Sequence, residues 1–231
     1  MNSTTAPVAR AAIQSLADLP LSEIAQLLPG ATAVFRRHRL DFCCGGAATL
    51  CDAARDRGLD LKGIEQQLRG LTAGTAAAPT EPHELIEHIL TRFHDTHRHE
   101  LPELIDLAHR IEARHEGHPD VPHGLAAMLQ TIAAELDAHM QKEEQVLFPM
   151  MRAGGAPMIV HPIAMMQHEH EEHGARLRRL EALTHDSVPP ADACNSWIAL
   201  YAGTRKLVDD VMQHIHIENN VLFPQLMPLE D

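Results

Sequence analysis

The sequence has no long apolar run and few aromatic residues. No stretch approaches the roughly 18 consecutive apolar residues of a membrane-spanning helix, and the N-terminus has no apolar core of a signal peptide. Aromatic side chains make up 3% of the chain, and clusters of β-branched residues are scarce beside Ala, Leu, Glu, Gln, Arg and Met. This composition favours helices over strands. We therefore expect an all-α protein that is neither exported nor inserted in a membrane.

Positive charge is also in short supply. The chain has 19 basic and 32 acidic residues, which gives a formal net charge of −13 with histidine neutral. This balance argues against nucleic acid or an anionic membrane surface as the main partner. A bound cation could neutralise part of the excess.

Cysteine is limited to four residues, and their spacing is not that of a disulfide framework. Cys43 and Cys44 are adjacent, and neighbouring cysteines seldom bridge to each other. Cys51 and Cys194 show no regular spacing to them. A reducing, cytoplasmic compartment is therefore expected.

Histidine, by contrast, is abundant. The 18 histidines are spread from His38 to His216 and never form a run. A tag or a histidine-rich tail would place them consecutively, so their distribution indicates a role inside the folded protein.

Several of these histidines belong to a stretch of sequence that occurs twice. His139–Pro149 and His214–Pro224 each contain a histidine, a glutamate four residues later and a Leu-Phe-Pro ending, at a constant offset of 75 residues. The first half of each unit has a matching pair of histidines three apart, offset by 76 residues: His94 with His97, and His170 with His173. The sequence thus predicts a duplicated helical hairpin.

Four amphipathic stretches follow residue 82, and in each the apolar residues recur at alternating steps of three and four. This spacing places them on one face of a helix. Short breaks separate the stretches, around 117–122, 154–157 and 187–190, and Pro102 inside the first stretch predicts a kink. The pattern predicts an up-down-up-down four-helix bundle.

Histidine and glutamate occupy inward positions on these faces that otherwise hold Leu, Ile, Val or Met. Each His-x-x-x-Glu pair lies one turn apart on one helix, so one helix can give two ligands to one site. Burying an unpaired carboxylate costs several kcal/mol, so a partner must compensate it. Carboxylates and imidazoles in one layer of a bundle indicate two metal ions that share bridging carboxylates. The predicted ligands are His94, His139, Glu143, His170, His214 and Glu218.

His97 and His173 lie one turn further along the same faces. Each could be an extra ligand, a hydrogen-bond partner of a ligand or a core histidine, and we favour a supporting or cavity-lining role over ligation. Glu144 lies about 100° round the helix from Glu143 and is expected to point away. The other polar residues near the site fall largely off the core face and are expected to be solvated: His168, Glu169, Glu171, Glu172 and His216.

The donor set narrows the choice of metal. No cysteine lies in the predicted ligand layer, which argues against structural zinc, and the predominance of imidazole argues against magnesium or calcium. Mixed imidazole and carboxylate ligation suits iron, followed by manganese. Two imidazoles and two bridging carboxylates per ion, with an oxo or hydroxo bridge, leave one position free for a small molecule. A free coordination position on each ion favours a reactive centre over inert metal storage.

The N-terminal part of the chain is organised differently, because proline and glycine divide it into short helical pieces. The predicted short helices cover 21–28, 31–39, 47–57 and 60–69. We predict a small helical domain over 1–70, a linker over 71–82 and the bundle over 83–231.

The small domain contains the motif Asp41-Phe42-Cys43-Cys44-Gly45-Gly46. The thiols precede a predicted helix N-terminus and follow Arg36, Arg37 and Arg39, two influences that would stabilise a thiolate. The alternative is two small buried hydrophobic residues beside a glycine turn. We expect reactive or metal-contacting thiols at Cys43 and Cys44.

Together these motifs resemble the hemerythrin-like di-iron proteins, and more closely the Repair of Iron Centers family of iron–sulfur cluster repair proteins. The bundle region has the histidine and glutamate motifs, and the small domain has Asp-Phe-Cys-Cys-Gly-Gly, which plain hemerythrins lack. The resemblance covers most of the chain. It implies a non-haem di-iron centre held by the six ligands named above. It also implies a cytoplasmic role in restoring iron–sulfur clusters damaged by nitric oxide or peroxide, by giving up iron or by chemistry with nitric oxide at the iron pair.

The expected partners are therefore damaged iron–sulfur proteins and nitric oxide, and a homodimer is a possible assembly. In this hypothesis Cys43 and Cys44 assist iron transfer. Two other functions stay open. One is reversible binding of oxygen or nitric oxide, as in hemerythrins. The other is enzymatic turnover, either reduction of nitric oxide to nitrous oxide or oxidation of ferrous iron.

Overall fold

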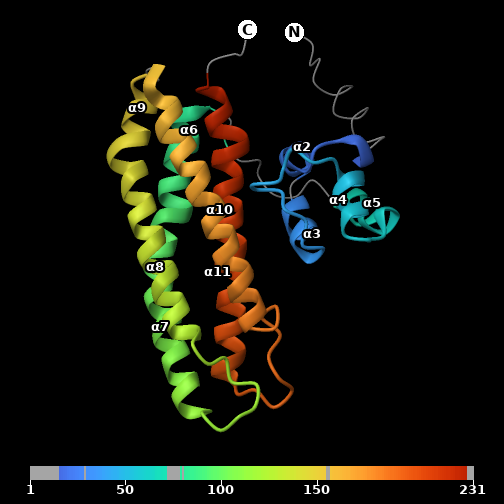
Figure 1. Cartoon of the computed structure of the whole chain (residues 1–231), viewed down its shortest axis with the longest axis vertical. Helices are drawn as coiled ribbons and strands as arrows, with labels where there is room; N and C mark the ends of the chain where they lie inside the picture. The colour runs from blue at the N-terminus through green and yellow to red at the C-terminus, as the bar shows by residue number, and fades with distance from the viewer. Residues whose placement is uncertain (1–15, 29, 72–78, 80, 155–156, 228–231) are drawn as a thin grey trace.

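The computed structural model describes residues 16–28, 30–71, 79, 81–154 and 157–227. A long bundle of four helical rods runs the length of the molecule, and a small helical module lies beside one half of it (Figure 1). The described residues form no strand, so the predicted all-α fold and the four-helix bundle are confirmed. None of the helices in these ranges combines the length and apolar character that crossing a bilayer requires.

The rods alternate in direction along the chain. The first consists of α6 (Pro82–Ile89), η2 (Leu90–His94) and α7 (Asp95–Arg114), and the second of α8 (Leu125–Lys142), η3 (Glu143–Leu147) and α9 (Phe148–Arg152). The third consists of η4 (Pro157–Ile159) and α10 (Val160–Leu183), and the fourth of α11 (Asn195–Ile217), η5 (Glu218–Leu222) and η6 (Phe223–Gln225). The connections between rods fall close to the predicted breaks. Pro102 lies inside α7, which continues through it, and the kink expected there stays a prediction.

Three rods contain one widened, π-helical turn of five residues, at η2, η3 and η5. In each, the amide after the turn bonds a carbonyl five residues earlier, for example Phe148 N to Glu143 O. The described part of α10 has no such turn. Single π-turns inside α-helices are frequent at functional sites, and these three begin or end at His94, Glu143 and Glu218.

The module contains η1 (Leu16–Asp18), α2 (Leu21–Leu27), α3 (Ala31–Arg37), α4 (Leu50–Asp56) and α5 (Leu61–Arg69). Thr49 caps α4 by accepting a hydrogen bond from Asp52 N at 3.1 Å, so this helix begins at Leu50 rather than at residue 47. The two thiols therefore precede a helix N-terminus, as predicted, but they lie further from it than the predicted start at residue 47 implied. The predicted linker over 71–82 falls largely outside the described residues, as does the beginning of the predicted domain 1–70.

Two apolar clusters fill the interior. The larger one, the main core, runs from the module into the half of the bundle around Leu129, Leu136 and Leu207. The smaller one, the end cluster, occupies the other end of the bundle and includes Phe93, Leu147, Ile163 and Phe223. Along every rod the buried histidine and glutamate positions fall between main-core and end-cluster residues. A polar layer thus separates two apolar regions.

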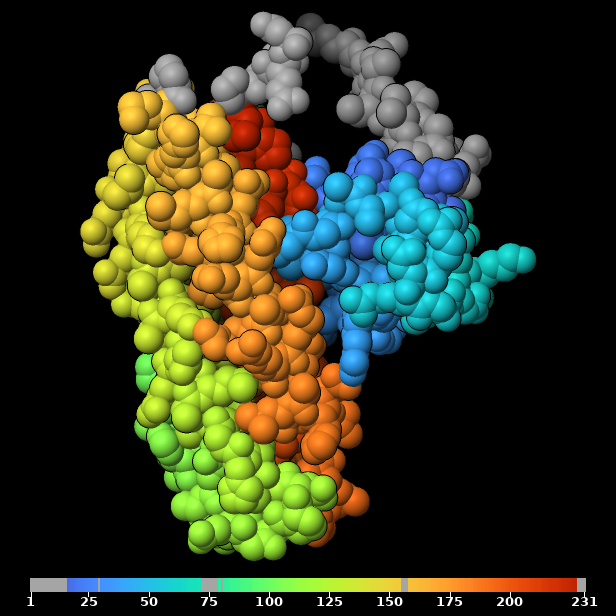
Figure 2. Space-filling view, in the orientation of Figure 1, coloured from blue at the N-terminus to red at the C-terminus, as the bar shows by residue number. Residues whose placement is uncertain are grey.

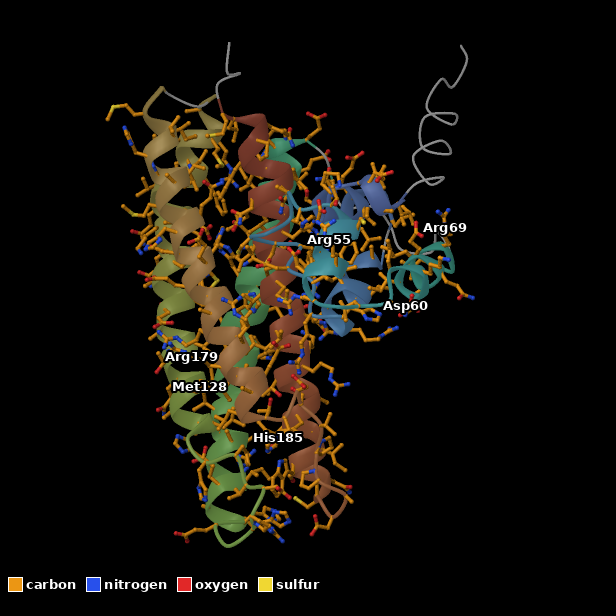
Figure 3. The ribbon with its side chains drawn as sticks, turned by 45° about the vertical axis from the view of Figure 1, so that its right-hand side comes forward. Arg55, Asp60, Arg69, Met128, Arg179 and His185 are labelled. Atoms are coloured by element: carbon orange, nitrogen blue, oxygen red, sulfur yellow. The ribbon has the colours of Figure 1, made fainter. Side chains whose placement is uncertain are left out.

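The module is seated against α10 and α11 (Figure 2). An ion pair joins Arg36 of α3 to Asp209 of α11, and Thr32 donates to Gln213 at 3.3 Å. Asp60 and Arg69, labelled in Figure 3, lie at the opposite edge of the module, away from the bundle. The thiol-bearing loop of the module therefore faces the bundle at the level of η5.

Candidate metal centre

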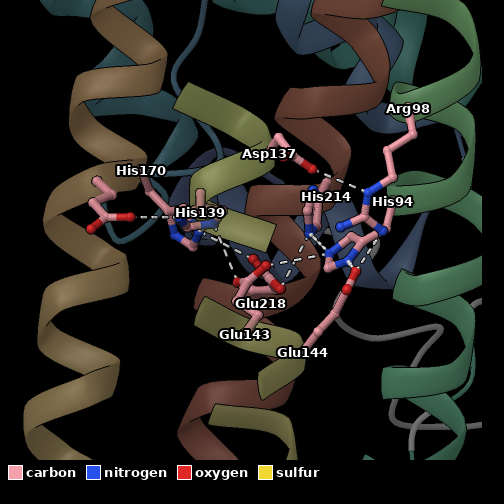
Figure 4. A network of polar contacts seen from close by, with 10 residues as sticks. His94, Arg98, Asp137, His139, Glu143, Glu144, His170, His214 and Glu218 are labelled. Atoms are coloured by element: carbon pink, nitrogen blue, oxygen red, sulfur yellow. Dashed lines mark hydrogen bonds and ion pairs between the residues drawn. The ribbon is translucent and has the colours of Figure 1, made fainter. Parts of the chain in front are cut away.

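Six buried side chains converge in the polar layer, with exposures of 0 to 1% (Figure 4). They are His94, His139, Glu143, His170, His214 and Glu218, so the structure brings together all six predicted ligands. Glu143 and Glu218 are the first residues of the widened turns η3 and η5, and His94 is the last residue of η2. Their coordination of metal stays a prediction, which the geometry below supports.

The donor atoms form two groups of four, and within each group they lie within 4.8 Å of one another: His94, Glu143, His214 and Glu218, and His139, Glu143, His170 and Glu218. Glu143 places Oε2 at 3.3 Å from His94 and Oε1 at 3.2 Å from His139. Glu218 places Oε1 at 3.2 Å from His214 and Oε2 at 3.1 Å from His170. Each glutamate thus offers one oxygen to each group, as a carboxylate that bridges two metal ions does.

The imidazoles of each group face each other through Nε2. The two Nε2 atoms are 3.3 Å apart for His94 and His214, and 3.1 Å apart for His139 and His170. Two nitrogens bound to one metal at about 2.1 Å lie about 3.0 to 3.4 Å apart, depending on the angle at the metal. The spacing therefore fits one ion in each group.

The hydrogen bonds on the other side of the rings supply a second test of that fit. His139 Nδ1 donates to Glu169 Oε2 at 2.9 Å, and His170 Nδ1 donates to Asn219 Oδ1 at 2.8 Å. With Nδ1 protonated, Nε2 of each neutral ring has a lone pair. Two lone pairs pointed at each other repel unless a proton or a metal ion lies between them. All four carboxylate oxygens of Glu143 and Glu218 are also buried without a hydrogen-bond partner.

Charges within the layer move the pKa values of its members in opposite directions. Burial and the charge of Glu218 act to raise the pKa of Glu143, but His139 and His94 outweigh them and hold it below its usual value. Burial acts to lower the pKa of His139, but the charges of Glu143 and Glu218 and the hydrogen bond to Glu169 raise it to about 9. In the metal-free chain protons on histidine therefore neutralise the glutamates. A metal ion would displace those protons, so its binding depends on pH.

Glu144 and Glu169 reach the site, although the sequence predicted that Glu144 points away and that Glu169 is solvated. Glu144 accepts a hydrogen bond from His94 Nδ1 at 2.7 Å and one from Arg98 at 2.8 Å. Glu169 accepts from Lys142 at 2.5 Å as well as from His139. Both predictions are wrong because a side chain at the edge of one rod can reach the imidazole of the next rod. Carboxylates in this position orient the ring and raise its basicity.

The duplication could have revealed Glu144 as a site residue. Asn219 lies 75 residues after Glu144, and each holds Nδ1 of the histidine from the first helix of its own repeat. The two repeats differ at the residue that directly precedes His94 and His170. Glu169 precedes His170, whereas Phe93 precedes His94 and stacks on His214 with ring centroids 5.3 Å apart. One half of the layer therefore has an additional carboxylate where the other has an aromatic ring.

Two family models match this chain. Residues 85–226 match the model described as "Hemerythrin HHE cation binding domain", and residues 17–72 match one described as "Domain of Unknown function (DUF542)". A "Probable iron-sulfur cluster repair protein" from Haemophilus influenzae is 46% identical over 219 residues, which cover 92% of this chain and 98% of the relative. The chain belongs to the hemerythrin-like iron–sulfur cluster repair family.

Other members of the repair family show similar identity. Proteins named "Iron-sulfur cluster repair protein YtfE" from Musicola paradisiaca and Cronobacter sakazakii are 47% and 46% identical to this chain. The matches cover 90% and 91% of the chain, and 95% and 96% of those relatives. The resemblance drawn from the motifs is therefore confirmed. The matched family model also confirms that the bundle is of a metal-binding type.

His97 and His173 flank the layer in this member of the repair family, and neither belongs to the two donor groups. The ring of His97 lies 5.9 Å from that of His214, and the ring of His173 lies 5.0 Å from that of His139. Both side chains are buried, and Nε2 of each has no hydrogen-bond partner. Burial, together with the neighbouring histidine charges, lowers the pKa of each to about 3, so both rings are neutral.

The module covers one edge of the site, which accounts for His216. The sequence predicted a solvated His216, but the side chain is 3% exposed and its Nδ1 lies 3.3 Å from the carbonyl oxygen of Phe42. That prediction is wrong because it considered the bundle without the module. His168, Glu171 and Glu172 are exposed, as predicted.

The thiols of the repair-family module lie in a different environment from the one predicted. Cys43 is buried and Cys44 is exposed, and their sulfurs are 3.7 Å apart. The hydrogen bond to Cys44, burial and the adjacent Asp41 carboxylate raise the pKa of the Cys43 thiol well above its usual range. The expectation that nearby arginines stabilise a thiolate at this position is therefore wrong for Cys43.

Proposed function

We propose that this chain holds two iron ions in the bundle and supplies iron for the repair of damaged iron–sulfur clusters. The observation that carries the proposal is the division of each bridging glutamate between the two donor groups, with one oxygen toward each. The repair function comes from the names of relatives that match more than nine-tenths of their length. The donor set supports iron, because imidazole and carboxylate together suit it better than magnesium, calcium or structural zinc.

The chain's own residues would hold the ions and keep them exchangeable. His94, His139 and His170 are fixed in orientation by hydrogen bonds at Nδ1, so their Nε2 atoms point into the two groups. The end cluster and the main core exclude water from both sides of the layer. Each group offers four protein donors, which is fewer than the six ligands of a closed octahedral site. An incompletely enclosed ion is easier to give up.

The test is restoration of an iron–sulfur enzyme whose cluster has been damaged by nitric oxide or peroxide. Iron-loaded protein should restore the enzyme's activity, and Glu143→Gln and Glu218→Gln should not, because each removes a shared carboxylate charge. Glu172→Gln, on the exposed face of α10, is the matched control and should restore activity like the unaltered chain. Equal restoration by all variants would refute the proposal.

Binding of nitric oxide is a second candidate function. The two donor groups are bordered by aromatic rings of the end cluster. Phe223 stacks on His170 with ring centroids 6.0 Å apart, and Phe148 stacks on His94 with centroids 5.9 Å apart. An apolar border of this kind suits a small, weakly polar diatomic molecule. Anaerobic titration of the iron-loaded chain with nitric oxide tests this candidate. Release on removal of the gas indicates carriage, and continued consumption with an added reductant indicates reduction to nitrous oxide.

We also propose a cytoplasmic location and, as partners, iron–sulfur proteins whose clusters have lost iron. All four cysteines are free thiols, which agrees with a reducing compartment. Fractionation of cells that express the full chain tests the location. Recovery in the membrane or the exported fraction would contradict it.

A further inference from the structure

The module contains a second group of potential metal donors, separate from the polar layer. Asp41, Cys43 and Cys44 each offer one donor atom, and the three atoms lie within 4.8 Å of one another. The two sulfurs are 3.7 Å apart, and Cys43 Sγ lies 3.4 Å from Asp41 Oδ1. In tetrahedral geometry, two sulfurs bound to one metal at about 2.3 Å lie about 3.8 Å apart, and a sulfur and an oxygen about 3.5 Å apart. The three atoms are therefore spaced like three corners of a tetrahedral thiolate site.

These residues line a cleft of about 830 Å³ between the module and the bundle. The charged side chains that line the cleft are Arg36, Arg39, Arg57 and Arg178, and Asp41, Glu171, Glu181 and Asp186. The four guanidinium groups balance the four carboxylates. Two thiolates would add two negative charges, and a divalent cation would neutralise them. The local charge is thus suited to a dithiolate site with an M²⁺ ion.

The backbone of this group is fixed from the bundle side. The carbonyl oxygen of Cys43 accepts hydrogen bonds from Asn219 Nδ2 and from Asn220 Nδ2, each at 3.2 Å. Inside the loop, Cys44 N donates to Asp41 Oδ1 at 3.0 Å. The three donors are therefore held in place before any ion arrives, which lowers the cost of ordering them.

We propose that Asp41, Cys43 and Cys44 form a mononuclear site for a thiophilic divalent ion of the first transition row, ferrous iron or zinc. The fourth position faces the cleft. Each thiol gives its proton to solvent as its sulfur binds, so one ion releases two protons. This site is separate from the paired site in the bundle, and the inference does not depend on cluster repair.

Cobalt(II) provides a test, because its thiolate complexes absorb in the near ultraviolet and its imidazole and carboxylate complexes do not give that band. Iron-loaded, reduced, full-length chain titrated anaerobically with Co²⁺ should bind one equivalent with a thiolate-to-cobalt band and keep its iron. Cys44→Ser should abolish the band. Asp41→Asn keeps an oxygen for the Cys44 amide but removes the charge, and should weaken binding at least about tenfold.

The controls separate a lost site from a lost fold. Cys44 is exposed, so its serine variant should keep the helical circular dichroism and the absorption of the bundle iron. The double variant Cys51→Ser with Cys194→Ser removes the other two thiols and should bind cobalt like the unaltered chain. A chain without a thiolate band, or a band that survives Cys44→Ser, would overturn the proposal. If the bundle does not hold iron, it would bind cobalt without giving the thiolate band. Failure of the proposed iron site is therefore distinguishable from failure of the thiolate site.

Competition identifies the class of ion. Zinc should displace the thiolate-bound cobalt near stoichiometry, and ferrous iron should displace it only in excess, in line with the general order of divalent affinities. Displacement by magnesium at the same concentration as zinc would contradict a thiophilic site.

Discussion

Asn219 accepts a hydrogen bond from Nδ1 of His170 at 2.8 Å while its amide nitrogen donates to the carbonyl oxygen of Cys43. One side chain thus connects a predicted metal ligand to the thiol-bearing loop of the module. At the matched position of the first repeat, Glu144 holds His94 but has no module beside it. An amide suits the second repeat because it accepts on one side and donates on the other, whereas an ionised carboxylate such as Glu144 only accepts.

Substitution of Asn219 should separate these two contacts. Asn219→Asp keeps an acceptor for His170 but places a carboxylate against the Cys43 carbonyl, so the module should loosen while iron is retained. Asn219→Leu removes both contacts and should lower iron affinity by about 10- to 100-fold. Iron affinity and hydrogen exchange of module amides report the two effects.

Asn220→Ala is the matched control for Asn219, since Asn220 contacts Cys43 but no predicted ligand. It should loosen the module and leave iron affinity unchanged. Equal loss of iron from Asn219→Asp and Asn219→Leu would show that Asn219 does not act on His170 as an acceptor.

His97 and His173 should be dispensable for holding iron. Each is buried with an unpartnered Nε2, and replacing such a group by an apolar side chain of similar size is nearly neutral or stabilising. His97→Leu and His173→Leu should therefore keep the same iron content. The metal-free chain should be equally stable or more stable, by up to about 2 kcal/mol in urea unfolding. His139→Leu is the comparison variant and should lose iron. Iron loss from His97→Leu or His173→Leu would show that the replaced histidine is a ligand.

The metal-free chain should become less stable as pH falls below 6.5. Burial lowers the folded-state pKa of His97 and His173 to about 3 and that of His216 to about 4, from an ordinary value of 6.5. Below pH 6.5 the unfolded chain binds these protons and the folded chain does not, so stability decreases with acid until the folded values are reached. Each histidine should contribute a slope of about 1.4 kcal/mol per pH unit.

Urea unfolding of the metal-free chain between pH 6.5 and about 5 measures that slope, above the range in which most carboxylates titrate. His139, with its pKa raised to about 9, is protonated in the folded chain throughout this window, so its contribution has the opposite sign and fades as the unfolded chain becomes protonated below pH 6.5. His216→Gln should remove the contribution of one histidine to the slope of stability against pH. An unchanged slope in this variant would mean that His216 is protonated in the folded chain.

Gly46 should be intolerant of any side chain. A Cβ atom there would lie 2.6 Å from the carbonyl oxygen of Phe42 and 3.2 Å from Asn220 Oδ1, so the loop would have to move away from the bundle. Gly46→Ala should cost about 1 to 3 kcal/mol of stability, measured by thermal or urea unfolding. Gly117→Ala, where no atom lies within 4 Å, should change stability by less than about 0.5 kcal/mol. Similar effects of the two substitutions would contradict the close approach.

The sequence predicted the bundle and the six convergent side chains because both depend on spacing along single helices. A histidine and a glutamate four residues apart share a face whatever else the chain does, and a buried carboxylate such as Glu218 needs a cation. The duplication also indicated which residues on different helices correspond, although they are far apart in the sequence.

The remaining features depend on which elements become neighbours. Glu169 lies off the core face of its own rod, and only the position of the adjacent rod brings it to His139. His216 is buried because the module covers it, and no periodicity within the bundle encodes that cover. The widened turns at η2, η3 and η5 have no residue signature comparable to proline or glycine.

The polar layer that separates the end cluster from the main core also divides the bundle into two regions that differ in local stability. The end cluster is the smaller of the two, and it joins the ends of all four rods without a residue of the module. Segments of this kind can unfold locally while the rest of a protein stays native. Fraying of this end would expose the ligands from one side only, so an ion could leave through a transient opening while the four rods and the docked module keep the donors ready to bind the next one.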